Sequence, residues 1–205
     1  MTNKLLIGSA NQDKARELTS LLAGLDCEVC SLADLTDVDA PEENGSTFAD
    51  NALLKATFYS KHFGLPCVAD DSGLCVDALN GAPGVYSARY AGEGCSYADN
   101  NEKLLDALAP YLWHERTARF VCCAAFVAPA EDAEATVHVE EGTVEGYIAM
   151  EAYGKNGFGY DPVFVPKGSD VTFAEMTAAE KHTISHRGRA FDKMAAFLRE
   201  RYAAV

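Results

Sequence analysis

Two adjacent carboxylates, Asp70 and Asp71, are the residues most suited to chemistry in this chain. They follow an apolar stretch, Leu65 to Ala69, and precede a Ser-Gly pair. The apolar stretch predicts a buried strand, and the Ser-Gly pair predicts that this strand ends in a turn. Because side chains alternate along a strand, we expect the two carboxylates to point to opposite faces. A carboxylate at the carboxyl end of a strand suits a metal ligand or a general base, but the same residue types also form plain polar turns.

A second candidate site is an anion-binding loop near the N-terminus. Lys4 to Gly8 predicts a short strand, and the following residues predict a helix with Asp13 as N-cap and Gly24 at its end. Lys14 then lies in the first helical turn, where the macrodipole disfavours a cation by up to ~1 kcal/mol. A bound phosphate would offset this cost, although a solvated surface lysine explains the same residues. The candidate anion ligands are the loop amides, Ser9, Asn11 and Lys14.

An acidic, irregular segment, Leu35 to Gly45, precedes a predicted helix from Ser46 to Phe63. Glu43 in this segment is either a solvated carboxylate or a hard-cation ligand that works together with the Asp-Asp pair. Mg²⁺ sites use one or two carboxylates with phosphate oxygens and water, which is compatible with the second interpretation. Asn51 and Lys55 share one polar face of the helix, which fits a substrate-facing edge or a solvated face.

A second glycine-rich loop, Gly154 to Pro166, carries Phe158 and Tyr160 between its glycines. These rings either stack on a nucleobase, which is worth about 1 to 3 kcal/mol, or belong to the core. Further along, basic side chains gather in an otherwise acidic chain. Their spacing does not match a zinc site, so base or phosphate recognition is the better use. They are Lys181, His182, His186 and Arg187.

These sites need a framework, and the pattern predicts an α/β fold with a central mixed β-sheet flanked by helices. Helices dominate the first half of the chain and strands the second. The further predicted elements are a loop-strand-loop region over residues 73–94, a helix capped by Ser96 and ended by Pro110, a strand over Thr117–Ala128, a turn over residues 129–134, an alternating strand through Val137 and Val139, a third strand over Thr143–Met150, and a C-terminal helix burying Phe191, Met194, Ala195, Leu198 and Tyr202.

Composition limits the function further. The chain has 205 residues, 48% of them hydrophobic, and a formal net charge of −14. We expect one domain over residues 1–205, with no non-specific binding to nucleic acid and no attraction to an anionic membrane. The opening apolar run is too short for a signal peptide, so we expect a cytoplasmic protein. Seven cysteines, an odd number among apolar neighbours, predict reduced core thiols.

Five motifs, in order along most of the chain, resemble the inosine triphosphate pyrophosphatase family. They are SANQDKARE, ENGSTFADNALLKA, VADDSGLCVDALNGAPGVYSARYAG, GFGYDPVF and ISHRGRA. The resemblance implies hydrolysis of ITP, dITP and XTP to the nucleoside monophosphate and pyrophosphate, with Mg²⁺ as cofactor. It also implies a homodimer whose subunits have two lobes around a substrate cleft.

The resemblance implies roles for individual residues as well. Asp71 becomes the general base or a metal ligand with Glu43, and Lys14 becomes catalytic as well as substrate-binding. A 6-oxo purine accepts hydrogen bonds where adenine donates, so donors placed there favour hypoxanthine and xanthine. The implied substrate-binding residues are Ser9, Asn11 and Lys14 for the triphosphate, Ser72, then Phe158, Gly159, Tyr160 and Asp161 around the purine, and Lys181, His186 and Arg187 for the base and its 6-oxo group.

Two departures from the family pattern concern the loops. Ala10 stands where the family usually has glycine, which restricts a backbone that approaches phosphate. Ala152 and Tyr153 replace a proline-containing approach to the second loop. Two other functions remain open on the sequence: a pyrophosphatase for modified pyrimidine or canonical nucleotides, and a nucleotide sensor without turnover.

Overall fold

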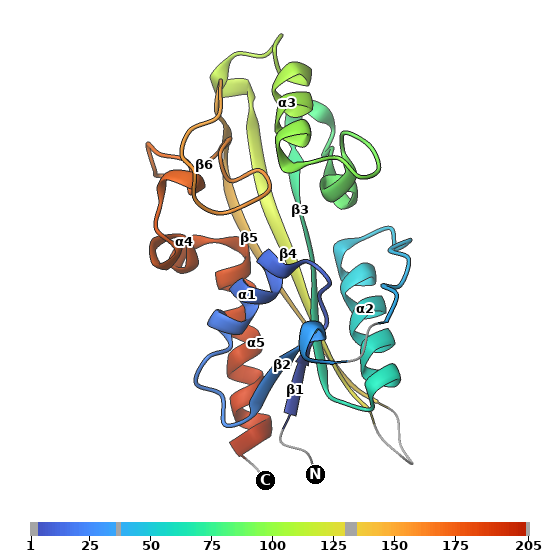
Figure 1. Cartoon of the computed structure of the whole chain (residues 1–205). Coiled ribbons are helices and arrows are strands. Elements are labelled where there is room, and N and C mark those ends of the chain that lie inside the picture. The colour runs from blue at the N-terminus through green and yellow to red at the C-terminus, as the bar shows by residue number, and fades with distance from the viewer. Residues whose placement is uncertain (1–3, 36–37, 130–134, 204–205) are drawn as a thin grey trace. The chain divides into compact units, whose positions relative to one another are not determined.

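A six-stranded sheet forms the framework of the protein in the computed structural model, which describes residues 4–35, 38–129 and 135–203. The strand order is β2-β1-β3-β4-β5-β6 (Figure 1). β1 runs parallel to β2 and β3, whereas β5 and β6 are antiparallel, so the predicted mixed sheet with flanking helices is confirmed. The strands are β1 Lys4–Ile7, β2 Glu28–Ser31, β3 Cys67–Val76, β4 Thr117–Ala128, β5 Thr136–Ile148 and β6 Phe164–Pro166; the α-helices are α1 Gln12–Leu21, α2 Phe48–Phe63, α3 Tyr97–Ala107, α4 Ala178–Ile184 and α5 His186–Ala203.

The chain divides into two compact units. Unit 1 comprises Met1–Asp71, Cys122–Gly142 and Arg187–Val205, and unit 2 comprises Ser72–Val121 and Thr143–His186. The three long strands β3, β4 and β5 each contribute residues to both units. The expected cleft between two lobes stays a prediction.

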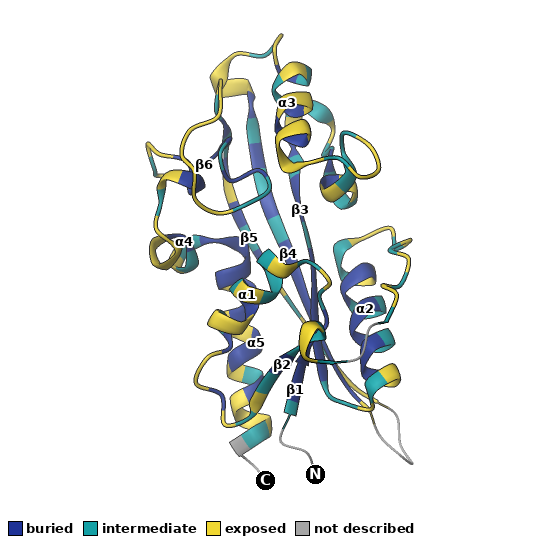
Figure 2. Cartoon of the chain, in the orientation of Figure 1, coloured by how far each residue is buried: buried dark blue, intermediate teal, exposed yellow. Residues whose placement is uncertain are grey.

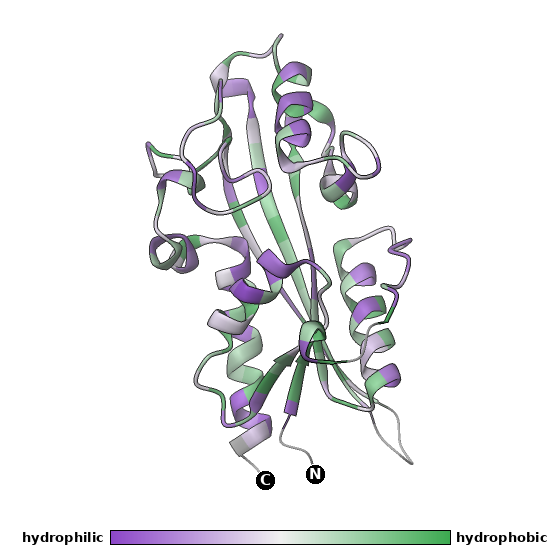
Figure 3. Cartoon of the chain, viewed as in Figure 1, coloured by the Kyte–Doolittle hydropathy of each residue, from purple (hydrophilic) through white to green (hydrophobic). Residues whose placement is uncertain are grey.

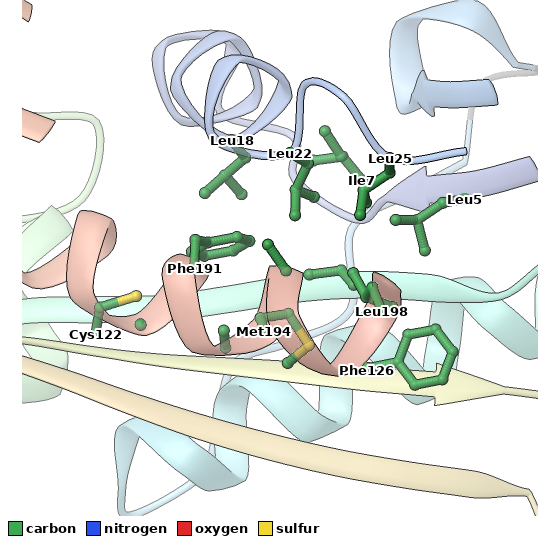
Figure 4. Close-up of a cluster of buried hydrophobic side chains, with 14 of the residues drawn as sticks. Leu5, Ile7, Leu18, Leu22, Leu25, Cys122, Phe126, Phe191, Met194 and Leu198 are labelled. Atoms are coloured by element: carbon green, nitrogen blue, oxygen red, sulfur yellow. The ribbon is translucent and has the colours of Figure 1, made fainter. Parts of the chain in front are cut away.

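Unit 1 buries both faces of its strands. Leu5 and Ile7 of β1 pack with Phe191 of α5 and with α1, and Figure 4 shows these side chains directed into one cluster. Leu6, between them in sequence, packs instead with Tyr59 of α2. Alternation along β1 therefore places α1 and α5 on one face and α2 on the other. Each fully buried Leu, Ile or Phe contributes about 1.5 to 3 kcal/mol.

The core of unit 2 is rich in aromatic residues. Phe120 of β4 lies 4.7 Å from Phe164 of β6 between ring centroids, and Phe173 lies 5.2 Å from Phe164. Leu104 of α3 packs on the same cluster. Figure 2 shows α3 buried on one side and exposed on the other, and Figure 3 shows β4 as largely hydrophobic, as expected for a half-buried helix beside a core strand.

The prediction that the strand carrying Asp70 and Asp71 ends in a turn at Ser72 and Gly73 was wrong. β3 does not turn at Ser72 and Gly73 but continues to Val76, so both carboxylates lie in the middle of a ten-residue strand. Turn preferences of Asp, Ser and Gly are weak, and the ladder with neighbouring strands overrides them. The strand passes from unit 1 to unit 2 directly after Asp71.

The first helix was predicted with the wrong caps. Its N-cap is Asn11 rather than Asp13, and the helix ends at Leu21 with Leu22 as C-cap, before Gly24. The Asn11 side chain accepts hydrogen bonds from the backbone N–H groups of Asp13 and Lys14, which sets the helix start two residues earlier.

Other predicted elements were confirmed or corrected. α2 begins after Thr47 with a capping box, and β4 has the predicted bounds. Residues 136–148 form one strand instead of two, and a 3₁₀ helix, Gly84–Arg89, replaces the strand expected in the glycine-rich region. The polar segment before the last helix is itself helical, as α4 and the first turn of α5. Residues 36–37 of the acidic segment and 130–134 of the predicted turn lie outside the described residues.

All seven cysteines are free thiols, as predicted, and Cys30, Cys67, Cys122 and Cys123 are buried. Of the helices in the described ranges, none combines the length and the apolar content that crossing a membrane requires.

Candidate active site

The two carboxylates of β3 point to opposite faces of the strand, as predicted. Asp70 is two residues after Val68 and points to the same face of β3, the face toward α1 and α5. The contacts of Asp70 come from these helices. Asp71 is four residues after Cys67 and points to the same face of β3, the face toward α2. The contacts of Asp71 come from α2. Strand alternation thus gives one Asp-Asp pair two separate environments within unit 1.

Asp70 holds two cations on the side of α1 and α5. Its Oδ2 lies 3.4 Å from Lys14 Nζ and 3.4 Å from Arg187 Nε. Arg187 also donates from Nη1 to Glu17 Oε2 at 3.2 Å. Asp70 is 1% exposed, so this is a buried network. The compensation expected for Lys14 at a helix N-terminus therefore comes, at least in part, from a carboxylate of the protein.

The loop before α1 is held tightly against the strands. A Cβ on Gly8 would lie 2.8 Å from Cys67 Sγ and 2.9 Å from a Tyr59 ring carbon, so only glycine fits without a shift. Ser9 Oγ donates to the Asn11 carbonyl at 3.4 Å. Because the Asn11 side-chain oxygen caps α1, the backbone amides of the first helical turn are oriented by this loop.

Asp71 belongs to a second charged group on the side of α2. Lys55 Nζ lies 3.6 Å from Asp71 Oδ1 and 3.1 Å from Glu43 Oε1, so one ammonium joins both carboxylates. Asn51 donates from Nδ2 to Asp71 Oδ2 at 3.0 Å. The sequence placed Asn51 and Lys55 on one helix face but left its use open; the structure shows that this face meets Asp71.

Burial and charge act against each other in this group. Burial raises the pKa of Asp71 above its usual range, although Lys55 and Lys14 favour the carboxylate. Burial by itself would lower the pKa of Lys55, but Asp71, Asp70 and Glu43 outweigh it, and the pKa is raised. The ammonium thus remains charged, while burial shifts Asp71 toward its protonated form.

The donor set of this group fits a hard divalent cation that takes its other ligands from phosphate and water. Two carboxylates already share one cationic group, Lys55, and carboxylate oxygens are what Mg²⁺ prefers. Within residues 4–35, 38–129 and 135–203, no three His, Cys, Asp or Glu side chains are grouped as metal ligands. Ligands supplied by a substrate would complete such a site.

Unit 2 holds the second glycine-rich loop in place through Asp161. This carboxylate is 2% exposed, and its Oδ2 accepts from Lys181 Nζ at 2.7 Å and from the Phe158 backbone N–H at 2.9 Å. The Lys181 ammonium also lies 5.1 Å from the centroid of the Phe158 ring. Asn101 of α3 donates to the Gly159 carbonyl at 2.9 Å, so the loop is fixed from two sides.

The remaining predicted residues are in different settings. Tyr160 is a core residue whose hydroxyl donates to the Ser87 carbonyl at 2.9 Å. His186 is buried and stacked on Phe120, with ring centroids 4.6 Å apart. Arg187, its neighbour, belongs to the Asp70 network of unit 1, so the basic cluster of the tail is split between the units. Ser72 is partly buried in β3.

Comparison with known proteins gives consistent matches over nearly the whole chain. The sequence model of the Ham1 family matches residues 5–197. The dITP/XTP pyrophosphatase of Elusimicrobium minutum (strain Pei191) is 45% identical over 195 residues, covering 93% of this chain and 97% of the relative. That of Haemophilus influenzae (strain Rd) is 46% identical over 190 residues, covering 93% and 96%.

Solved structures agree with these sequence matches. The Staphylococcus aureus Ham1 protein superposes with a TM-score of 0.83 at 43% identity, covering 97% of this chain and 99% of that chain. A HAM1 protein from Coxiella burnetii superposes with a TM-score of 0.84 at 40% identity, covering 98% and 100%.

Proposed function

The chain belongs to the Ham1 family, and we propose on this premise that it is a nucleoside triphosphate pyrophosphatase for non-canonical purine nucleotides. It hydrolyses ITP, dITP and XTP to the nucleoside monophosphate and pyrophosphate, and so removes them from the nucleotide pool. Relatives that are about 45% identical over almost their full length carry the name dITP/XTP pyrophosphatase.

The observation that carries the chemistry is the charged group of Glu43, Lys55 and Asp71 in unit 1. Phosphoryl transfer requires that charge on the phosphates is neutralised and that water is positioned. Lys14, in the first turn of α1, supplies a cation and helical amides for the triphosphate together with Ser9 and Asn11. Asp71, which lies beside Lys55 and Asn51, accepts the proton of the attacking water in this proposal.

Mg²⁺ is the cofactor we assign, with Glu43 and Asp71 as its protein ligands. When bound, it supplies Lewis-acid stabilisation of the phosphate oxygens. The two carboxylates outnumber the one ammonium that they share, Lys55, so the group keeps a negative charge that favours binding of a further cation.

For the base we propose the loop of unit 2. Phe158 stacks on the purine, and Gly159, Tyr160 and Asp161 shape its surroundings, with Ser72 as a further contact. Lys181 and His186 of unit 2 supply donors toward the 6-oxo group, which hypoxanthine and xanthine present and adenine lacks. The role that the resemblance implies for Arg187 is not part of this proposal, because its contacts are with Asp70 and Glu17 in unit 1. The Asp161 contacts with Lys181 and Phe158 support this assignment because they order the donor and the aromatic ring together.

We propose that the protein is a homodimer in the cytoplasm, where nucleotide pools are found. It acts on a small nucleotide and has no nucleic acid or membrane partner. Exposed Leu112 and Trp113 offer apolar surface of the kind that subunit contacts use. Light scattering coupled to gel filtration measures the oligomeric state.

The experiment that tests the function is pyrophosphate release from ITP, dITP, XTP, GTP and ATP with Mg²⁺, for the native chain and Asp71→Asn. We expect fast release from ITP, dITP and XTP, and its loss in the variant. Equal rates with all five nucleotides would contradict the base selectivity. Tight binding of ITP without release would identify a nucleotide sensor, and preferential hydrolysis of a modified pyrimidine would identify the related pyrophosphatase class.

A further inference from the structure

Asn51 links Asp71 to the loop that carries Glu43, and nothing in its local sequence requires this. It lies in the first turns of α2, and its side chain is buried, with the residue 1% exposed. A buried primary amide must place two donors and an acceptor, so its contacts carry information about the site.

Both ends of the Asn51 amide are used. Its Oδ1 accepts from the Gly45 backbone N–H at 2.8 Å, and its Nδ2 donates to Asp71 Oδ2 at 3.0 Å. The backbone N–H is only a donor and the ionised carboxylate only an acceptor, so the orientation of the amide is fixed by its partners. The amide thus ties β3 to the loop that carries Glu43, two residues before Gly45.

Two residues of α2 contact different carboxylate oxygens of Asp71. Asn51 holds Oδ2, whereas Lys55, one turn later, lies 3.6 Å from Oδ1 and 3.1 Å from Glu43. The oxygen on the side of Glu43 and Lys55 is therefore Oδ1. A carboxylate without a partner on Oδ2 would rotate and present either oxygen.

Gly45 is fitted to this contact. A Cβ at this position would lie 2.6 Å from Asn51 Oδ1 and 2.7 Å from Asp50 Cβ. The close approach of the loop backbone to the amide thus depends on glycine.

We infer that Asn51 is a positioning residue, which orients Asp71 toward the cation site and holds the Glu43 loop at the distance needed for both carboxylates to share one cation. It acts through Asp71 and Glu43 and does not touch the reacting atoms. The kinetic test of the inference rests on the proposed function, whereas its binding test requires nucleotide binding but no turnover.

The experiment compares Asn51→Leu with the native chain. Leucine is similar in size and removes both hydrogen bonds without adding charge. Loss of residues that orient metal ligands typically costs about 10- to 100-fold in metal affinity or activity. We expect kcat for ITP to fall by that factor and the Mg²⁺ concentration for half-maximal rate to rise about 10-fold or more. KM for ITP at saturating Mg²⁺ stays nearly unchanged, because the triphosphate loop before α1 is untouched.

A matched control is Asn100→Leu in unit 2. Asn100 is also buried, and its amide also joins a helix to a loop, accepting from Ala91 N–H at 2.7 Å and donating to the Ala88 carbonyl at 3.2 Å. We expect this variant to lose stability as Asn51→Leu does, but to keep the native metal dependence. If Asn51→Leu fails to fold, Gly45→Ala serves instead, since it retains the amide and displaces it.

Metal binding is measured without turnover by electron paramagnetic resonance of Mn²⁺, with the protein and the α,β-methylene analogue of ITP. Weaker Mn²⁺ binding in Asn51→Leu or Gly45→Ala, but not in Asn100→Leu, supports the inference. Native Mn²⁺ affinity in both Asn51→Leu and Gly45→Ala overturns it. If the native chain releases no pyrophosphate from ITP or XTP, the proposed function fails, while the Mn²⁺ measurement still decides the role of Asn51.

Discussion

The same substitution at two neighbouring residues should cost very different amounts of stability. Asp70→Asn removes a carboxylate whose side chain is fully buried and which lies 3.4 Å from both Lys14 and Arg187. Removing one partner from a buried ion pair costs about 3 to 5 kcal/mol, because the remaining charge stays buried. This is a large fraction of the roughly 5 to 15 kcal/mol that stabilises a typical domain.

Asp71→Asn should behave differently, because Lys55 keeps its contact with Glu43 at 3.1 Å. In Asp70→Asn, Arg187 keeps its contact with Glu17, but Lys14 loses its ion pair with Asp70. The variant loses one acceptor interaction, worth about 1 kcal/mol. This loss is offset because asparagine is uncharged: the variant no longer bears the cost of burying a carboxylate, which is the cost that raises the pKa of Asp71. We expect the free energy of unfolding to change by no more than about 1 kcal/mol, while pyrophosphate release is lost.

Urea denaturation followed by far-ultraviolet circular dichroism measures both variants. Tryptophan fluorescence is a poor probe, since the single tryptophan, Trp113, is 64% exposed. We expect Asp70→Asn to be at least ~2 kcal/mol less stable than Asp71→Asn. Equal stability of the two variants would refute the division of the pair between a structural network and a catalytic group.

Three further predictions follow from the site. Burial raises the pKa of Asp71 in the folded protein. Its contribution to stability is therefore present below the pKa of an ordinary aspartate, about 4, and is lost as the pH rises through the raised pKa of Asp71. The difference in unfolding free energy between the native chain and Asp71→Asn should show this dependence when it is measured across pH, and a difference that does not change with pH would contradict it. Phe158→Ala should raise KM for ITP roughly 5- to 150-fold with little change in kcat, the effect of losing one stacked base, and an unchanged KM would assign the ring to packing alone. Burial raises the pKa of Cys122 well above its usual range and that of Cys123 to about 12, so mass spectrometry after iodoacetamide treatment at pH 8 should find both unmodified in the native protein and modified in urea; rapid native labelling of either would contradict their burial.

The sequence by itself determined the elements that local signals specify. Thr47 and Asp50 form a capping box that starts α2, and the largely apolar run of β4 set its bounds. It also determined that Asp70 and Asp71 face opposite ways, because alternation is a property of any strand. These features need no knowledge of distant parts of the chain.

The tertiary structure decided where β3 ends and which partners each carboxylate has. Local residue preferences predicted a turn at Ser72, but pairing in the sheet extends the strand to Val76. Arg187, which contacts Asp70, lies 117 residues away in sequence. The Asn51 amide meets Asp71 only because α2 packs on that face of β3. Such contacts join residues through packing of whole elements, and no periodicity within one segment encodes which element will lie opposite.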